Sequence, residues 1–197
     1  RKIRDEYLEP MRTYEFPVIE LNENTDLEAV CLIFETVNTT GIQLTIFELL
    51  TARYWPLGID LRQLWERALE EYPIIQEFEV EPVTLLQIVA LLTSEKSPVC
   101  KRKHLLNIDG KQLIEFWPVA AQALSSTLQV LKNECGVMSS KWLPYSTLLP
   151  GMAAIMSKIE IKNGPARGDA LHKVKKWFWT SVFSQRYDAT TDEKNAQ

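Results

Sequence analysis

The chain of 197 residues is 46% hydrophobic and 24% charged, and its formal net charge is −4. These values are ordinary for a soluble globular protein with one sizeable core, so a single domain is the default expectation. No run of about 18 apolar residues occurs, which excludes a membrane-spanning helix, and we expect no membrane partner.

The three cysteines indicate neither a disulfide framework nor a metal site. Cys31, Cys100 and Cys135 are odd in number and widely spaced, and no pair has metal-ligand spacing. Cys31 and Cys135 fall on apolar helical faces, where a free cysteine behaves as a small hydrophobic residue. This cysteine usage fits a reducing cytoplasm best.

The charges are distributed unevenly along the chain. Residues 1–100 carry 18 acidic and 8 basic side chains, whereas residues 101–197 carry 8 acidic and 14 basic side chains. A basic half can mark a surface that faces nucleic acid, and it can equally be a solvated face that complements the acidic half. Composition leaves both interpretations open.

Residues 1–24 predict a helix and a strand that connect to an absent upstream domain. The chain begins inside a charged helical segment without an initiator Met or a signal-peptide core, which suggests a piece of a longer protein. Tyr14–Leu21 alternates as a strand, with Phe16 and Val18 inward, and Pro17 confines it to a sheet edge. No second convincing strand follows, so we expect its partners to lie in the missing sequence.

Two helix starts frame a short polar loop in the next segment. Thr25 and Glu28 have capping-box spacing before one apolar run, and Thr45 and Glu48 repeat that spacing before the next. Between these helices Gly41 suits a left-handed turn. The loop places four polar side chains near the start of the second helix, where the helix dipole favours an anion: Asn38, Thr39, Thr40 and Gln43. The same loop also fits an ordinary helix–helix connection.

The remaining sequence predicts further helices. Asp60 and Gln63 start one that Pro73 ends, and Pro82 suits the first position of a nearly all-apolar helix over 83–93. Residues 94–107 form a loop and a short helix. Longer helices over 109–135, 148–159 and 168–187 follow. Asp109 caps the first of them, its apolar stripe includes Trp117, Leu124 and Leu128, and Gly136 closes it. We therefore predict a mainly α fold with about seven or eight helices, one helical domain over 25–187 and a polar tail over 188–197.

Two segments resemble the GmrSD-type restriction family, whose amino-terminal part is a ParB-like domain. FETVNTTGIQLTIFELL is similar to the family signature FE-x-x-N-x-x-G-x-x-L-x-x-x-E-L. The matching residues are Phe34, Glu35, Asn38, Gly41, Leu44, Glu48 and Leu49. The segment Trp177–Tyr187 resembles the family's aromatic helix that ends in a Ser-x-Arg-Tyr element. The resemblance covers most of the chain, although the middle matches only in helical character.

The resemblance implies that this chain is the helical portion of a protein that acts in modification-dependent restriction and phage defence. This portion would brace a nucleotide site and contribute DNA contacts. Its partners would be the missing ParB-like and nuclease domains of the same protein. A nucleoside triphosphate and a divalent metal would act only in the full-length protein, because the family's Asp-Gly-Gln-Gln-Arg and nuclease motifs do not occur here.

Other catalytic signals are not found. There is no P-loop, no Gly-rich dinucleotide fingerprint and no metal-ligand spacing. His104 and His172 each lie beside a lysine and outside any recognisable nucleophile context. We therefore expect no catalytic residue, no cofactor and no metal site in this chain.

Two candidate contact regions emerge. The first is the loop of Asn38, Thr39, Thr40, Gly41 and Gln43, for nucleotide or domain contact. The second lies in the last helix, where Lys173, Lys176 and Arg186 are candidates for phosphate or DNA contact, although Arg186 also fits a structural ion pair. Trp177 and Trp179 cannot share one helix face, so one can pack while the other is exposed and stacks on a base, although core packing of the pair is the stronger interpretation. The alternative function is a helical protein-interaction module with no ligand site, and a third class is a stand-alone DNA-binding protein.

Overall fold

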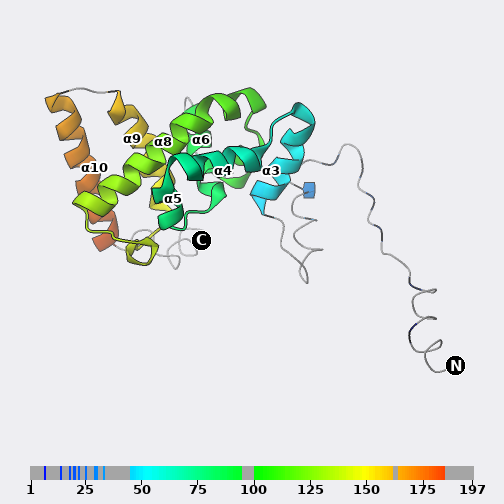
Figure 1. Cartoon of the computed structure of the whole chain (residues 1–197), viewed down its shortest axis with the longest axis horizontal. Coiled ribbons are helices and arrows are strands. Elements are labelled where there is room, and N and C mark those ends of the chain that lie inside the picture. Colours follow the sequence, from blue (N-terminus) through cyan, green and yellow to red (C-terminus); the bar gives the residue numbers. More distant parts are fainter. Residues whose placement is uncertain are drawn as a thin grey trace, which may run out of the picture.

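The structure, a computed structural model, describes residues 45–94, 100–161 and 164–184, together with residues 7, 14, 18, 20, 22, 25, 29, 30 and 33. The three long ranges contain eight α-helices and two short 3-10 helices, and no strand (Figure 1). The α-helices are α3 (Ile46–Tyr54), α4 (Leu61–Glu71), α5 (Pro73–Glu77), α6 (Pro82–Thr93), α7 (Arg102–Leu106), α8 (Gly110–Glu134), α9 (Leu148–Glu160) and α10 (Pro165–Phe183). The 3-10 helices are η2 (Trp55–Leu57) and η3 (Ser140–Trp142). The predicted mainly α fold is confirmed.

Helix α6 is the centre of the core, as its apolar sequence predicts. It packs against α3, α7, α8 and α9. Its buried side chains are Leu85, Leu86, Ile88, Val89 and Ala90. Almost every position on this helix is apolar, so its side chains must be buried on several sides. Several other helices therefore have to surround it.

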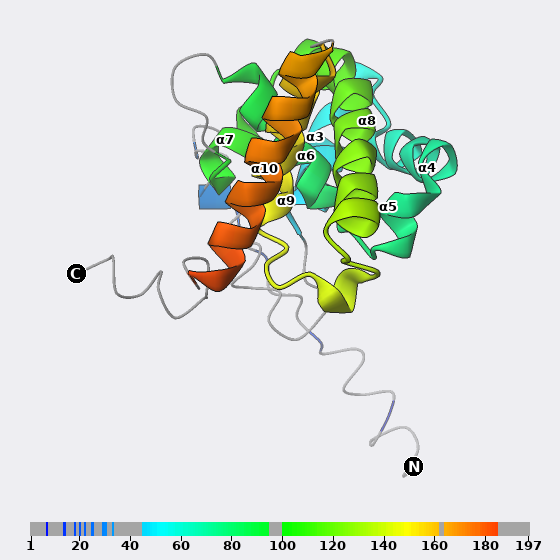
Figure 2. The same cartoon turned by 90° about the vertical axis from the view of Figure 1, so that its left-hand side faces the viewer.

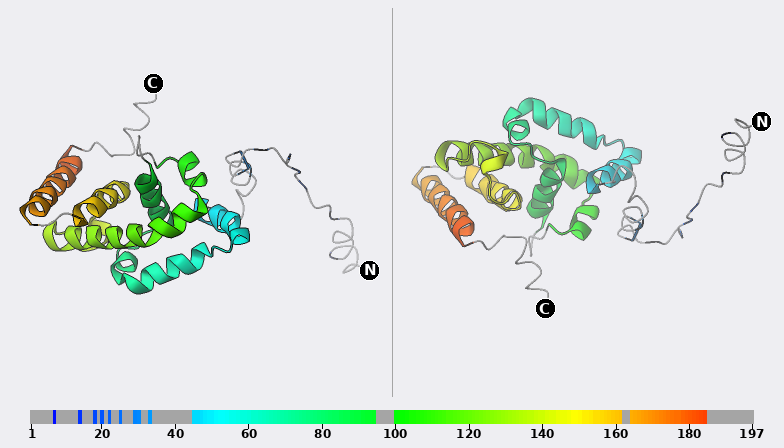
Figure 3. Two further views of the ribbon diagram at one scale, coloured as in Figure 1. Left: turned by 90° about the horizontal axis from the view of Figure 1, so that it is seen from above. Right: turned by 90° about the horizontal axis from the view of Figure 1, so that it is seen from below.

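Helix α8 is the longest element and organises the other helices around α6. Viewed along the vertical axis of Figure 1, it lies between α4 on one side and α6 with α9 on the other, while α3 and α10 occupy opposite ends (Figure 3). The predicted apolar stripe of α8 is buried, including Trp117, Leu124 and Leu128. Gly136 has a φ of 70° and ends the helix, and the Val137 N–H donates to the Leu131 carbonyl at 3.0 Å.

Local sequence signals set most helix starts. The Asp60 carboxylate accepts hydrogen bonds from the N–H groups of Arg62 and Gln63 at 3.0 and 3.1 Å, which caps α4. The Asp109 carboxylate likewise accepts from the Lys111 N–H at 3.0 Å and caps α8. Both caps, and Pro82 at the first position of α6, confirm the predictions.

Two helix starts, at Pro73 and Pro165, differ from the predictions. Pro73 ends α4 as expected, but it also begins the short helix α5, because a proline at the first helical position loses no hydrogen bond. For the same reason α10 begins at Pro165 rather than near Gly168. The strand predicted over 14–21 lies mostly outside the described residues. Of its described positions, Tyr14, Val18 and Glu20 carry no strand, and Val18, expected inward, is 76% exposed.

Two long-range hydrogen bonds tie the first helices to α8. The buried Tyr54 hydroxyl at the end of α3 donates to the Ile108 carbonyl at 2.7 Å, just before α8 begins. The Trp117 indole N–H on α8 donates to the Leu64 carbonyl of α4 at 3.1 Å. Burial raises the pKa of Tyr54 to about 12.

Replacing Tyr54 by Phe removes the only donor that the described residues offer to the Ile108 carbonyl. Because a buried acceptor is then unsatisfied, Tyr54→Phe should lower the free energy of unfolding by about 1–2 kcal/mol, measured by urea unfolding. The control Tyr7→Phe, at a side chain that is 63% exposed, should change it by less than about 0.5 kcal/mol. Equal unfolding free energies for wild type and Tyr54→Phe would contradict this role.

The raised pKa of Tyr54 also has a pH signature. Its stabilising effect is fully present below the ordinary tyrosine pKa of 10 and is lost as the pH rises through about 12. In an ultraviolet titration of tyrosine ionisation, the wild type should therefore show a late component near that pH. Tyr54→Phe should lack this component, whereas Tyr7→Phe should retain it.

Candidate functional site

The first candidate region lies outside the described residues. This holds for all five of its members, Asn38, Thr39, Thr40, Gly41 and Gln43, and also for Arg186 of the second region. Their proposed contacts stay predictions. Ala29, Val30 and Ile33, in the helix predicted before the loop, are helical, and the helix after the loop is described from its first turn.

The capping box predicted for that following helix is present in α3. The Glu48 carboxylate accepts hydrogen bonds from the Thr45 hydroxyl and from the Thr45 N–H, the latter at 2.8 Å. Although partial burial opposes it, these two hydrogen bonds hold the pKa of Glu48 below its ordinary value. Glu48 is therefore a structural cap, as predicted, and it fixes the point at which the candidate loop enters α3.

The second candidate region lies on α10, the helix at one end of the molecule (Figure 2). Val174, Phe178 and Ser181 form its buried face, and α9 is the helix it contacts most. Lys173 and Lys176 are both exposed. The structure thus places the two described cations of this region on one helix with their side chains in solvent.

Lys175 behaves differently from these two lysines. Its ammonium group lies 2.6 Å from the carboxylate of Glu134, at the end of α8. This hydrogen bond raises the pKa of Lys175 above its ordinary value. Lys175 therefore joins α10 to α8 and does not belong to the outer face of α10.

Trp177 and Trp179 lie in different surroundings, so core packing of the pair, the stronger interpretation of the sequence, is wrong for Trp179. Trp177 is partly buried and lines an apolar groove of about 360 Å³ between α9 and α10, with Ile155, Lys158 and Lys173 among the other lining residues. Trp179 is 39% exposed. One tryptophan packs and the other reaches solvent.

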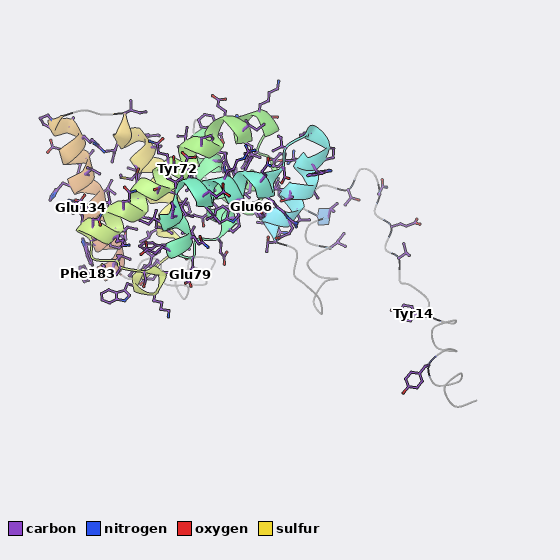
Figure 4. All side chains as sticks on the ribbon, viewed as in Figure 1. Tyr14, Glu66, Tyr72, Glu79, Glu134 and Phe183 are labelled. Atoms are coloured by element: carbon purple, nitrogen blue, oxygen red, sulfur yellow. The ribbon has the colours of Figure 1, made fainter. Side chains whose placement is uncertain are left out.

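Phe183 was missed by sequence reasoning. Its ring stacks on that of Trp179 with centroids 5.6 Å apart and an interplanar angle of 20°, and it is 78% exposed at the end of α10 (Figure 4). The Phe178 ring also contacts the Trp179 ring, in an edge-to-face arrangement with centroids 5.3 Å apart. The spacing of Lys176, Trp179 and Phe183 at i, i+3 and i+7 was the available signal, because these positions share a helical face.

We call the set of Lys173, Lys176, Trp179 and Phe183 the α10 outer surface. Within the described part of the chain, the ammonium groups of its two lysines are unpaired. Its two aromatic rings are already stacked on each other. It contains no pair of groups for acid–base chemistry. In the ranges that the structure describes, no group of three or more His, Cys, Asp or Glu side chains could hold a metal ion. The arrangement is suited to binding rather than catalysis.

No helix within the described ranges is long and apolar enough to span a membrane. No protein-family profile matches the chain, and no solved structure matches it. The chain is similar to the uncharacterized protein MJ0686 of Methanocaldococcus jannaschii, with 33% identity over an alignment of 201 positions that covers 95% of this chain. It spans about a third of that protein's length, since the alignment covers 33% of the relative.

The capping box makes a testable prediction about pH. Because the pKa of Glu48 is lowered in the folded protein, its contribution is present above the ordinary value of 4.5 and is lost as the pH falls through the lower folded value. Glu48→Gln should lower the free energy of unfolding by roughly 0.5 kcal/mol at pH 7, and this difference should shrink below pH 4.5.

The measurement is urea unfolding of both proteins between pH 3 and pH 7. Glu66→Gln on the exposed face of α4 is the matched control and should show a small difference with no such pH dependence. A Glu48→Gln effect that grows as the pH falls would contradict the capping role.

Proposed function

We propose that this chain is the helical portion of a GmrSD-like, ParB-like-domain protein of modification-dependent restriction and phage defence, and that its α10 outer surface contacts nucleic acid. The observation that carries the contact is the exposed, stacked Trp179–Phe183 pair on the same helix as the exposed Lys173 and Lys176. Every base offers a flat face for stacking, and lysine ammonium groups pair with phosphates.

The energetics favour such a surface for unpaired bases. Stacking of a base on an aromatic side chain contributes about 1–3 kcal/mol per base, and each phosphate contact releases a bound counterion. Because Trp179 and Phe183 are already stacked, the surface loses little side-chain freedom on binding. The preferred ligand is therefore a single strand or a locally opened duplex.

The role of the first candidate region rests on the family resemblance. In this proposal Asn38, Thr39, Thr40 and Gln43 form one wall of a nucleotide site that an upstream ParB-like domain completes. A nucleoside triphosphate, a divalent metal and the nuclease residues would belong to the other domains of the full-length protein, in the cytoplasm. The capping box supports this by holding the first residue after the loop region, Thr45, against the start of α3.

A second candidate function is a helical protein-interaction module. The same Phe183 ring that is 78% exposed would also suit a protein partner, because exposed aromatic side chains are enriched at interfaces. The two functions differ in their dependence on salt. Binding through phosphates weakens steeply as salt rises, whereas apolar contact with a protein does not.

The test is fluorescence anisotropy of the chain with a labelled single-stranded oligonucleotide across a salt series. Substituting both Lys173 and Lys176 by Gln should weaken binding by roughly tenfold at low salt and reduce the slope of log K against log salt by about 1.4. Trp179→Ala should weaken binding by about tenfold or more with little change in the slope.

The matched control substitutes Lys103 and Lys111, two exposed lysines outside α10, by Gln. It removes the same charge and should leave binding nearly unchanged. Equal losses in the two double variants would show that the attraction is general rather than local. No binding at low salt would contradict the nucleic-acid role and favour the interaction module.

A further inference from the structure

A cavity of about 560 Å³ lies on a part of the molecule that the α10 outer surface does not include. Four separate parts of the chain line it: the connection from α5 to α6, one side of α6, Cys100 before α7, and the segment from η3 to the start of α9. Its volume falls in the range of small-molecule sites in proteins, about 300–1,000 Å³.

The polar side chains of α6 gather at this cavity. Apart from Thr93, whose hydroxyl donates to the Val89 carbonyl at 3.0 Å, the polar residues of α6 are Thr84 and Gln87. Both line the cavity. A helix that is otherwise built for the core therefore keeps hydrogen-bonding groups only where the cavity meets it.

Two carboxylates border the same space, Glu79 and Glu81. The Ser140 hydroxyl of η3 donates to the Glu79 carboxylate at 2.6 Å, which holds that carboxylate at the cavity wall. Glu81 precedes α6 at the capping position, but its side chain makes no capping hydrogen bond. Neither carboxylate has a basic partner within the part of the chain that the structure describes.

The backbone at Glu79 has a conformation that disfavours a side chain. Its φ of 50° makes it the one residue other than glycine with positive φ in the described ranges. It lies just after the end of α5, where glycine is the usual residue because an L side chain is disfavoured in this conformation. The carboxylate is the group that a glycine at this position would lack.

The charge of the lining selects the class of ligand. Among the residues that the structure describes, the lining has two carboxylates and no Lys, Arg or His, so an anion such as a nucleotide is disfavoured there and a cation is favoured. Apolar side chains, including Phe78, Val83 and Leu149, supply a surface for a hydrocarbon chain. We infer that this cavity binds a small aliphatic amine of the polyamine class, with ammonium groups at Glu79 and Glu81 and the carbon chain on the apolar wall. This inference does not depend on the proposed function.

The test is isothermal titration calorimetry of the chain with spermidine at 150 mM salt. The wild type should bind saturably with one site, and Glu79→Gln should weaken binding about tenfold, since a charge-assisted hydrogen bond is lost. Glu66→Gln removes the same charge from α4 and should bind as the wild type does; Figure 4 shows both side chains. Absence of saturable binding, or equal losses in the two variants, would overturn the proposal.

A second variant separates binding from folding. Glu79→Gly suits the positive φ, so its melting temperature should equal or exceed that of the wild type, whereas spermidine binding should weaken by about tenfold or more. Cys100, which lines the cavity, gives an independent readout: spermidine should slow its alkylation in the wild type, followed by peptide mass spectrometry, and not in Glu79→Gly. Unchanged binding in Glu79→Gly would contradict the inference.

Discussion

The need to bury α6 constrains the rest of this fold. Nine of its twelve residues are apolar, so the helix is stable only when other helices cover it. Helices α8 and α9 form two of its walls, and α3 and α7 close others. Because α9 packs against α6 and α8, only its remaining side is open to α10. The outer side of α10 is therefore left in solvent, where Lys176, Trp179 and Phe183 lie.

The same constraint explains where polar groups remain on α6. Thr84 and Gln87 are tolerated because they line a cavity, which the segment from η3 to α9 borders without filling. The molecule thus has two surfaces of opposite character. The α10 outer surface is cationic and aromatic, whereas the cavity is bordered by carboxylates, and the two would select different ligands.

Local sequence signals predicted much of the fold. The caps at Thr45, Asp60 and Asp109 and the end of α8 at Gly136 depend on neighbouring residues, which a single sequence displays. The cavity could not be predicted in this way, because it brings together residues up to about 70 positions apart. Lys175 and Glu134 are likewise 41 residues apart, and their ion pair joins α10 to α8. This ion pair distinguishes Lys175 from the exposed Lys173 and Lys176, and the sequence alone does not reveal it. The positive φ of Glu79 was also not foreseen, since glycine is the usual signal for that conformation.

The central claim is that the α10 outer surface contacts nucleic acid through stacked aromatic rings. The most direct test is photo-cross-linking of the chain to a single-stranded oligonucleotide that carries 5-iodouracil, followed by mapping of the cross-linked peptide by mass spectrometry. The account predicts cross-links within residues 177–186, the tryptic peptide that contains Trp179 and Phe183. Cross-links that map to other helices, with none in this peptide, would contradict it.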